Sequence, residues 1–269
     1  MKRSTKILLS ILLIIFLGYI LVCVWFYRGQ EKALFTKVPH PANYVYKFNV
    51  PFEERNITMA DGKKLNGVLF KSDSSKGLIL WLPGGRGMLD SLSEEAAFYT
   101  RLNYDVFIIN YRGFGKSEGA ITSEEQFGND MQTVYDSFKK QYSENNIVVY
   151  GYSLGSGPAA RLAAENHPKM LLLLAPYYSL EDMTQKAIPY LPMSLLMKYH
   201  FNTFEQLKKT KSPIIIFHGD GDTKIKVEAS QRLKEYLKPA DQLIILPGQP
   251  HNNFTGNEQY LAELKKVLA

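Results

Sequence analysis

The pattern of hydrophobic positions divides the chain into one long apolar segment and a larger region of short apolar runs. Residues 7–27 are almost purely apolar, with three basic side chains before them and Arg28 after them. As a helix, this segment would rise about 31 Å, which matches the thickness of a bilayer's hydrocarbon core, about 30 Å. The pattern therefore predicts a single transmembrane anchor within residues 1–28.

A cleaved signal peptide is the competing interpretation of this segment. Signal peptides have an apolar region of about 7–15 residues that ends at a small-residue cleavage site. Here the end of the segment, residues 22–27, is bulky, and the residues before Cys23 resemble a lipid-attachment site poorly. We therefore expect an uncleaved anchor. The small excess of positive charge before it favours an N-terminus inside and a folded domain on the outer, periplasmic or extracellular, side.

After a polar connector at residues 29–43, strand-like runs alternate with amphipathic helical stretches. The first two runs flank Asp61-Gly62, a pair typical of a hairpin turn. The later alternation favours a parallel sheet with helices on both faces. Residues 44–269 are thus predicted to form an α/β fold with a mostly parallel, twisted sheet of about eight strands. The runs are 56–59, 65–70, 78–82, 105–109, 147–150, 170–174, 214–217 and 243–246, and the helical stretches are 91–102, 123–142, 155–165, 227–237 and 257–268.

Charge and cysteine content narrow the classes of partner. The formal net charge is +6, but residues 1–30 hold four basic and no acidic side chains. The rest of the chain is close to neutral, which argues against nucleic acid as a partner. Cys23 is the one cysteine, so neither an intrachain disulfide nor a cysteine-based metal site is expected. We expect no cofactor and no bound metal.

Residues 151–155 read Gly-Tyr-Ser-Leu-Gly, the G-x-S-x-G pattern of a nucleophilic serine on a sharp strand-to-helix turn. The pattern alone is weak, because glycine and serine are common residues. Its setting strengthens it, since a strand-like run ends at residue 150 and a helical stretch follows. Glycines leave room for the tight turn, and the helix N-terminus directs free N–H groups at the reaction centre. Ser153 is therefore the predicted nucleophile, and a turn that binds nothing is the alternative.

A serine nucleophile needs a base within hydrogen-bond reach and an acid that orients the base. Of the five histidines, only His218 and His251 follow predicted strands downstream of Ser153, at the strand ends where ligands bind in open α/β sheets. His251 comes directly after the last strand, as the base of such a site should. A loop histidine that caps a turn is the alternative interpretation of His251.

Three carboxylates are candidates for the acid. Asp220 and Asp222 lie in a turn just beyond the run at 214–217. For either of them, a purely structural role in that turn is the alternative to a catalytic one. Asp182 lies in the connecting region before that run. Spacing alone does not choose among the three.

The oxyanion of an acyl-transfer reaction is normally stabilised by two backbone N–H groups. One is expected from Leu154, the residue after the nucleophile, and the other from the loop after the third strand. That loop, residues 82–87, reads Leu-Pro-Gly-Gly-Arg-Gly, and its glycines let the backbone approach a substrate closely. Gly85 is the expected donor, with Arg86 next. A phosphate-binding loop is a weaker interpretation, because the G-K-[ST] ending is absent.

Together these residues resemble the α/β-hydrolase superfamily, and most closely its small membrane-anchored serine hydrolases, which include protein-depalmitoylating enzymes and bacterial relatives. The resemblance extends from about residue 56 to the C-terminus and implies the α/β-hydrolase fold. It implies that the acid is Asp222, three residues after Gly219. The segments that carry it are 83–85, 110–119, 151–157 and 218–222, together with His251.

The resemblance also bears on residues outside the triad. It implies a structural turn at residues 111–115, so Arg112 receives no catalytic role. Pro83 stands where the family usually has histidine, so the second oxyanion donor is Gly85 or a neighbour. Residues 177–212 occupy the position of a short helical cap over the active site. This insert is rich in methionine and aromatic residues, which would suit an acyl chain, although packing onto the sheet explains them equally well.

The sequence thus predicts a membrane-anchored serine hydrolase that cleaves esters or thioesters of small-molecule or acylated substrates through an acyl-enzyme. Tyr152, Tyr177 and Tyr178 are the expected substrate contacts. A serine peptidase of the aminopeptidase type is one alternative, because the same machinery attacks amides. An inactive α/β-hydrolase-fold binding protein is another.

Overall fold

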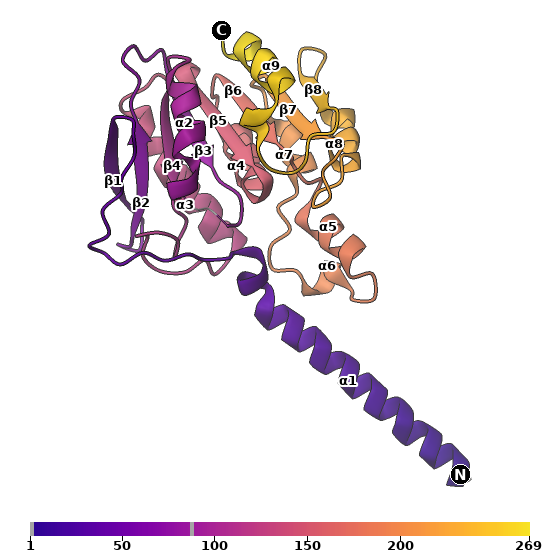
Figure 1. Cartoon of the computed structure of the whole chain (residues 1–269). Helices are drawn as coiled ribbons and strands as arrows, with labels where there is room; N and C mark the ends of the chain where they lie inside the picture. Colours follow the sequence, from indigo (N-terminus) through magenta and orange to yellow (C-terminus); the bar gives the residue numbers. More distant parts are fainter. Residues whose placement is uncertain (1–2, 87–88) are drawn as a thin grey trace.

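The computed structural model describes residues 3–86 and 89–269 and consists of one long helix and one α/β domain (Figure 1). Lys2 and Gly87, which belong to the predicted anchor and loop, lie outside the described residues. Helix α1 (Arg3–Leu34) carries the N-terminus far from the domain. Among the described residues it is the one helix long and apolar enough to cross a membrane.

Helix α1 continues past residue 28, so the first part of the predicted connector at 29–43 is helical. Residues 30–34 are Gln, Glu, Lys, Ala and Leu, all good helix formers, which explains the extension. The connector proper is therefore shorter than its composition suggested, and the helix reaches the folded domain directly.

An eight-stranded sheet forms the centre of the domain, in the order β1-β2-β4-β3-β5-β6-β7-β8. Strand β2 pairs antiparallel with both β1 and β4, and β3 to β8 run parallel. The predicted mostly parallel sheet is confirmed. The strands are β1 (Phe52–Thr58), β2 (Lys64–Phe70), β3 (Leu78–Leu82), β4 (Asp105–Ile109), β5 (Ile147–Tyr152), β6 (Met170–Leu174), β7 (Ile214–Gly219) and β8 (Gln242–Leu246).

Helices cover both faces of the sheet because the central strands bury side chains on both. In β3, Leu78, Leu80 and Leu82 belong to one apolar layer, and Ile79 and Trp81 to the other. Helices α3 (Glu124–Lys139) and α4 (Ser156–Glu165) contribute to the first layer, and α2 (Ser93–Thr100) and α9 (Glu258–Leu268) to the second. The α/β-hydrolase fold predicted from the sequence is thus confirmed.

Three predicted helices are shorter than expected, among them α2, which spans Ser93–Thr100 of the predicted 91–102. Helix α3 ends at Lys139, three residues before the predicted end, and α8 (Glu228–Leu233) passes into a short 3-10 turn, η4 (Lys234–Tyr236). The start of α3 is as expected, because the Gln126 N–H donates to the Ser123 hydroxyl at 3.0 Å and caps the helix.

Between β6 and β7 the chain forms three short helices in the segment predicted as a cap. They are α5 (Leu180–Ala187), α6 (Met193–Leu196) and α7 (Thr203–Lys209). Helix α7 packs against α4, whereas α5 and α6 extend from the domain on the side from which α1 leaves it (Figure 1).

Candidate active site

Ser153 lies in the sharp turn between β5 and α4. Its φ is 52°, a left-handed conformation that non-glycine residues rarely adopt and that is common at functional sites. The turn is too tight for side chains at the motif glycines. A Cβ atom on Gly155 would collide with the Leu82 carbonyl, and one on Gly151 would lie 2.6 Å from the Ala159 side chain. The packing therefore requires both glycines and fixes the serine at the carboxyl end of β5.

Ser153, His251 and Asp222 form one chain of hydrogen bonds. His251 Nε2 lies 3.0 Å from Ser153 Oγ, and His251 Nδ1 lies 2.6 Å from Asp222 Oδ2. With a proton on Nδ1 that donates to the carboxylate, Nε2 is free to accept the hydroxyl proton of the serine. The three side chains follow β5, β7 and β8, and the carboxyl ends of these parallel strands meet at one edge of the sheet.

Asp222 is fully buried and accepts hydrogen bonds from several directions. The Lys224 and Ile225 N–H groups donate to Oδ1 at 2.8 and 2.9 Å, and His218 Nε2 lies 3.5 Å from Oδ2. Burial alone raises the pKa of Asp222, but the hydrogen bonds from His218, His251 and the Ile225 N–H outweigh it and hold the pKa well below its usual range. The carboxylate is therefore ionised at neutral pH and is placed to orient the His251 ring.

The other candidates for acid and base have different partners. Asp220 Oδ1 accepts the Gly248 N–H at 2.6 Å and so ties together the loops after β7 and β8. Asp182 lies on α5 and pairs with Arg232 at 2.8 Å. His218 is buried, with Nδ1 2.6 Å from Ser230 Oγ and Nε2 2.8 Å from the Ile225 carbonyl oxygen. Its contact with Asp222 makes His218 a support of the acid that sequence reasoning missed.

The glycine loop after β3 lies beside the serine. A Cβ atom on Gly84 would lie 3.4 Å from Ser153 Cβ. The Tyr111 hydroxyl donates to the Pro83 carbonyl at 2.7 Å, and the Thr36 N–H donates to the Gly85 carbonyl at 2.9 Å. The loop is therefore held from both sides. Thr36 was not expected at the site, because it belongs to the segment predicted as a connector.

The expected oxyanion donors are both near the serine. Gly85 lines the same pocket as Ser153. Leu154 lies in the first turn of the short helix η3 (Ser153–Gly155), where backbone N–H groups lack acceptors within the helix. The leucine side chain also meets the loop, because a Cβ on Gly85 would lie 3.1 Å from Leu154 Cδ2.

A pocket of about 510 Å³ opens over Ser153 and His251. Tyr152 lines it, and its hydroxyl donates to Asn252 Oδ1 at 2.6 Å. The walls also include residues at and just after the end of α1, and residues of η1 (Leu89–Leu92) and α2, that carry no motif, so the sequence offered no signal for them. These additional wall residues include Ala33, Leu34, Thr36, Leu92 and Glu95.

Tyr177 and Tyr178, the other expected substrate contacts, lie outside the residues that line this pocket. Tyr177 is buried, and its hydroxyl accepts the Gly157 N–H and donates to the Leu154 carbonyl, each at 3.1 Å. Tyr178 stacks on Phe204 with ring centroids 4.5 Å apart. Both tyrosines come directly before α5, so they hold the base of the cap and the turn behind the serine. Their predicted contact with substrate stays a prediction.

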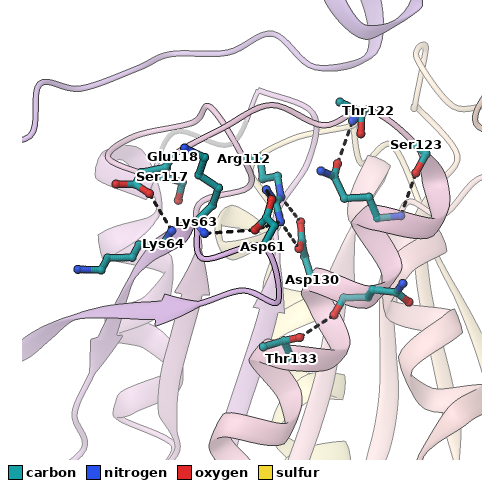
Figure 2. Close-up of polar contacts among 12 residues, drawn as sticks. Asp61, Lys63, Lys64, Arg112, Ser117, Glu118, Thr122, Ser123, Asp130 and Thr133 are labelled. Atoms are coloured by element: carbon teal, nitrogen blue, oxygen red, sulfur yellow. Dashed lines mark hydrogen bonds and ion pairs between the residues drawn. The ribbon is translucent and has the colours of Figure 1, made fainter.

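Arg112 forms a structural network, in agreement with the role that the resemblance implies. Its Nε donates to Asp130 Oδ2 and its Nη1 to Asp61 Oδ2, both at 2.6 Å (Figure 2). The network joins the turn of the β1–β2 hairpin, the turn after β4 and helix α3.

Comparisons with known proteins agree with this architecture. A family model described as serine aminopeptidase, S33, matches residues 73–208. The protein bem46 of Schizosaccharomyces pombe is 30% identical over 214 residues, which cover 75% of this chain and 67% of that protein. An uncharacterised protein of Mycobacterium tuberculosis is 27% identical over 201 residues, which cover 73% of this chain and 71% of the relative.

Solved structures show the same fold. The structure of an esterase from Pyrococcus furiosus superposes with a TM-score of 0.66 and 22% identity, covering 87% of this chain and 97% of the esterase. The family model spans half of the chain, including β3 to β6 and Ser153. From its fold and these matches, we conclude that the chain belongs to the α/β-hydrolase superfamily and, within it, to the family described as serine aminopeptidase S33.

Proposed function

We propose that this protein is a membrane-anchored serine hydrolase that cleaves ester or thioester bonds of acyl-type substrates. The observation that carries the proposal is the hydrogen-bonded chain from Ser153 Oγ through His251 to Asp222, with distances of 3.0 and 2.6 Å. In this proposal Ser153 is the nucleophile, His251 the general base and Asp222 the orienting acid. Helix α1 is the anchor.

The proposed reaction has two steps. Ser153 Oγ attacks the acyl carbonyl carbon while His251 Nε2 takes the hydroxyl proton, and the negative charge of Asp222 stabilises the imidazolium. The N–H groups of Leu154 and Gly85 stabilise the oxyanion. His251 then gives its proton to the departing alcohol or thiol, which leaves an acyl-enzyme. Water attacks this ester with His251 again as base, releases the carboxylic acid and restores the serine.

The pocket walls support an acyl substrate. Leu34, Leu92, Leu174 and Phe254 contribute apolar surface around Ser153. Pockets of this kind hold apolar groups, while a few polar atoms orient the reacting bond.

Labelling by a fluorophosphonate probe and hydrolysis of p-nitrophenyl esters of increasing chain length test the proposal. We expect wild-type protein to be labelled and Ser153→Ala to lose both labelling and activity, with kcat lower by about 10⁶-fold, the usual effect of removing such a nucleophile. Ser137→Ala on α3, whose hydroxyl donates to the Val134 carbonyl of its own helix at 2.6 Å, is the control and should behave as wild type. Equal ester hydrolysis by wild type and Ser153→Ala would refute the proposal.

A second candidate function, aminopeptidase activity, rests on Glu95. This residue lies on α2, is half-buried and lines the pocket over Ser153. Within residues 3–86 and 89–269 its carboxyl makes no hydrogen bond or ion pair, and burial raises its pKa. An incoming ammonium group would compensate the cost of burying this carboxylate, so Glu95 is suited to the N-terminus of a peptide.

Glu95→Gln separates the two candidates. An aminopeptidase should lose hydrolysis of aminoacyl p-nitroanilides in this variant, with a higher KM, while an uncharged ester reacts as before. Glu94→Gln, at the exposed neighbouring position, is the matched control. Wild-type protein that hydrolyses esters and leaves every aminoacyl anilide intact would exclude the aminopeptidase.

A further inference from the structure

The cap reaches far along the side of α1. Near the end of the helix, the Gln30 side chain bonds the cap backbone twice, donating to the Leu196 carbonyl at 2.6 Å and accepting the Lys198 N–H at 2.9 Å. Further toward the N-terminus, the Tyr19 hydroxyl donates to the Tyr190 carbonyl at 3.0 Å. The cap therefore lies beside the helix over a large part of its apolar run.

These contacts place Tyr190 beside the interior of the apolar run of α1, well away from its C-terminal end. Tyr19 precedes Tyr27, the last residue of the apolar run, by eight positions, or about 12 Å of helix. The part of the run before Tyr19, residues 7–18, rises only about 18 Å, too little for a hydrocarbon core of about 30 Å. If the whole run fills the core, Tyr190 lies about 12 Å inside it.

The composition of the cap fits this depth. Residues 187–197, which we name the cap tip, contain no charged side chain, and Lys186 and Lys198 stand directly before and after them. Tyr190 and Leu195 are 85% and 80% exposed and, with Ile188, are the large apolar side chains that the described residues leave exposed on the cap tip. The cap tip therefore presents a group of apolar side chains that the described part of the domain leaves uncovered, whereas Leu191, Met193 and Met197 pack inward.

The apolar surface of the cap and that of α1 end at the same position along the helix axis. Lys198 pairs with Glu31 at 2.9 Å, and its Nζ lies 4.5 Å from the centre of the Tyr27 ring. Tyr27 and Arg28 mark the end of the apolar run on α1. A lysine and a tyrosine at this level are typical of the boundary between acyl chains and headgroups.

The backbone of the cap tip is also suited to a hydrocarbon environment, where exposed polar groups find no water. All five carbonyl groups of residues 188–192 accept hydrogen bonds. The donors are the Gln185 side chain, which bonds two of them, the Tyr19 hydroxyl, and the N–H groups of Leu191 and Leu195. Two of the five residues, Pro189 and Pro192, have no N–H to satisfy.

We infer that the cap tip is immersed in the bilayer leaflet that holds the C-terminal half of α1, so that the domain is seated in the membrane by two apolar elements. The inference rests on the membrane anchor of the proposed function. Ala33, Leu34 and Thr36 follow the apolar run closely and line the pocket, which places the pocket near the headgroup layer. The substrate class that fits this position is an acyl ester or thioester whose chain lies in the bilayer.

Spin labels on the full chain in phosphatidylcholine vesicles test this immersion. Cys23→Ala removes the one native cysteine, and Tyr190→Cys or Leu195→Cys then carries the label on the cap tip. Val45→Cys is the matched control, because Val45 is also strongly exposed, at 69%, but lies outside helix and cap. Leu13→Cys, in α1, is the reference for a side chain in lipid.

We expect labels at 190, 195 and 13 to collide more often with oxygen than with a water-soluble nickel chelate, and the label at 45 to show the reverse. Water-like labels at 190 and 195 with a lipid-like label at 13 would overturn the inference and leave the anchor standing. A water-like label at 13 would remove the anchor and the inference together. Fluorophosphonate labelling of each variant reports an intact hydrolase separately, so that failure of the enzymatic proposal is not confused with failure of the membrane contact.

Discussion

Asp222 illustrates how single residues set the chemistry of the site. Its carboxylate is buried, yet hydrogen bonds from two histidines and two backbone N–H groups keep its pKa below the ordinary range. A group whose pKa is depressed on folding stabilises the folded state above its unfolded pKa, about 3.9 for aspartate. This stabilisation is lost as the pH falls below that value toward the folded pKa.

Asp222→Asn should therefore affect activity and stability in different ways. We expect kcat to fall about 10⁴-fold, because the amide retains the shape of the side chain but loses the charge that stabilises the imidazolium. Urea unfolding should show a stability deficit for the variant at pH 7 that narrows below about pH 4. A deficit that stays constant down to pH 3 would contradict the assigned charge state. Asp220→Asn, at the exposed neighbouring position, is the control and should retain most activity.

At the scale of elements, the close approach of loops assembles the site. A Cβ atom on Gly219, at the end of β7, would collide with the Gln249 carbonyl in the loop after β8. Only glycine allows these loops to come near enough for Asp222 to meet His251. Toward the β1–β2 end of the sheet, Arg112 joins a hairpin turn, the turn after β4 and helix α3 through two carboxylates (Figure 2).

The Arg112 network should contribute to stability rather than to reaction. Arg112→Met leaves Asp130, whose side chain is 8% exposed, without its buried partner, so we expect a loss of about 3–5 kcal/mol in the free energy of unfolding. Asp61→Asn should cost much less, because that side chain is 49% exposed. Denaturant titration measures both, and fluorophosphonate labelling of the folded fraction should be unchanged. Equal losses in the two variants would argue against a buried network.

At the scale of the whole molecule, the helix and the catalytic domain form a continuous structure. The Thr36 N–H bonds the Gly85 carbonyl, and Leu34 lines the pocket over Ser153. The C-terminal end of α1 is thus part of the proposed active site, and the cap is bonded to the same helix through Gln30. Under the proposed function and the inferred seating of the cap tip, this arrangement would bring substrate to the serine from the membrane side.

The same arrangement makes the membrane orientation testable. With the N-terminus inside, as we propose from the distribution of positive charge, Val45 lies on the outer side. In cells carrying the Cys23→Ala, Val45→Cys variant, a membrane-impermeant maleimide should label the protein without permeabilisation. Labelling only after the membrane is opened would reverse the proposed orientation. A cytosolic protein with an added surface cysteine controls for leakage.

The sequence by itself predicted the eight strands, the turn that carries Ser153 and the histidine after the last strand, although β1 begins four residues before its predicted start. These features depend on local patterns, namely apolar runs of strand length and glycines at a tight turn, which neighbouring residues specify. Helix ends were less certain because composition alone predicts them; the extension of α1 through Leu34 follows from helix-forming residues in a polar segment.

Only the tertiary structure decided which residues meet. From the residues alone, Asp220 and Asp222 were equivalent, and the resemblance favoured Asp222. The structure turns Asp222 toward His251 and Asp220 toward Gly248, because the approach of the loops at Gly219 sets the direction of each carboxylate. It likewise assigns Tyr177 to the support of the turn and brings the end of α1 to the pocket. Such contacts join segments far apart in the chain, and packing in three dimensions, rather than any local pattern, determines them.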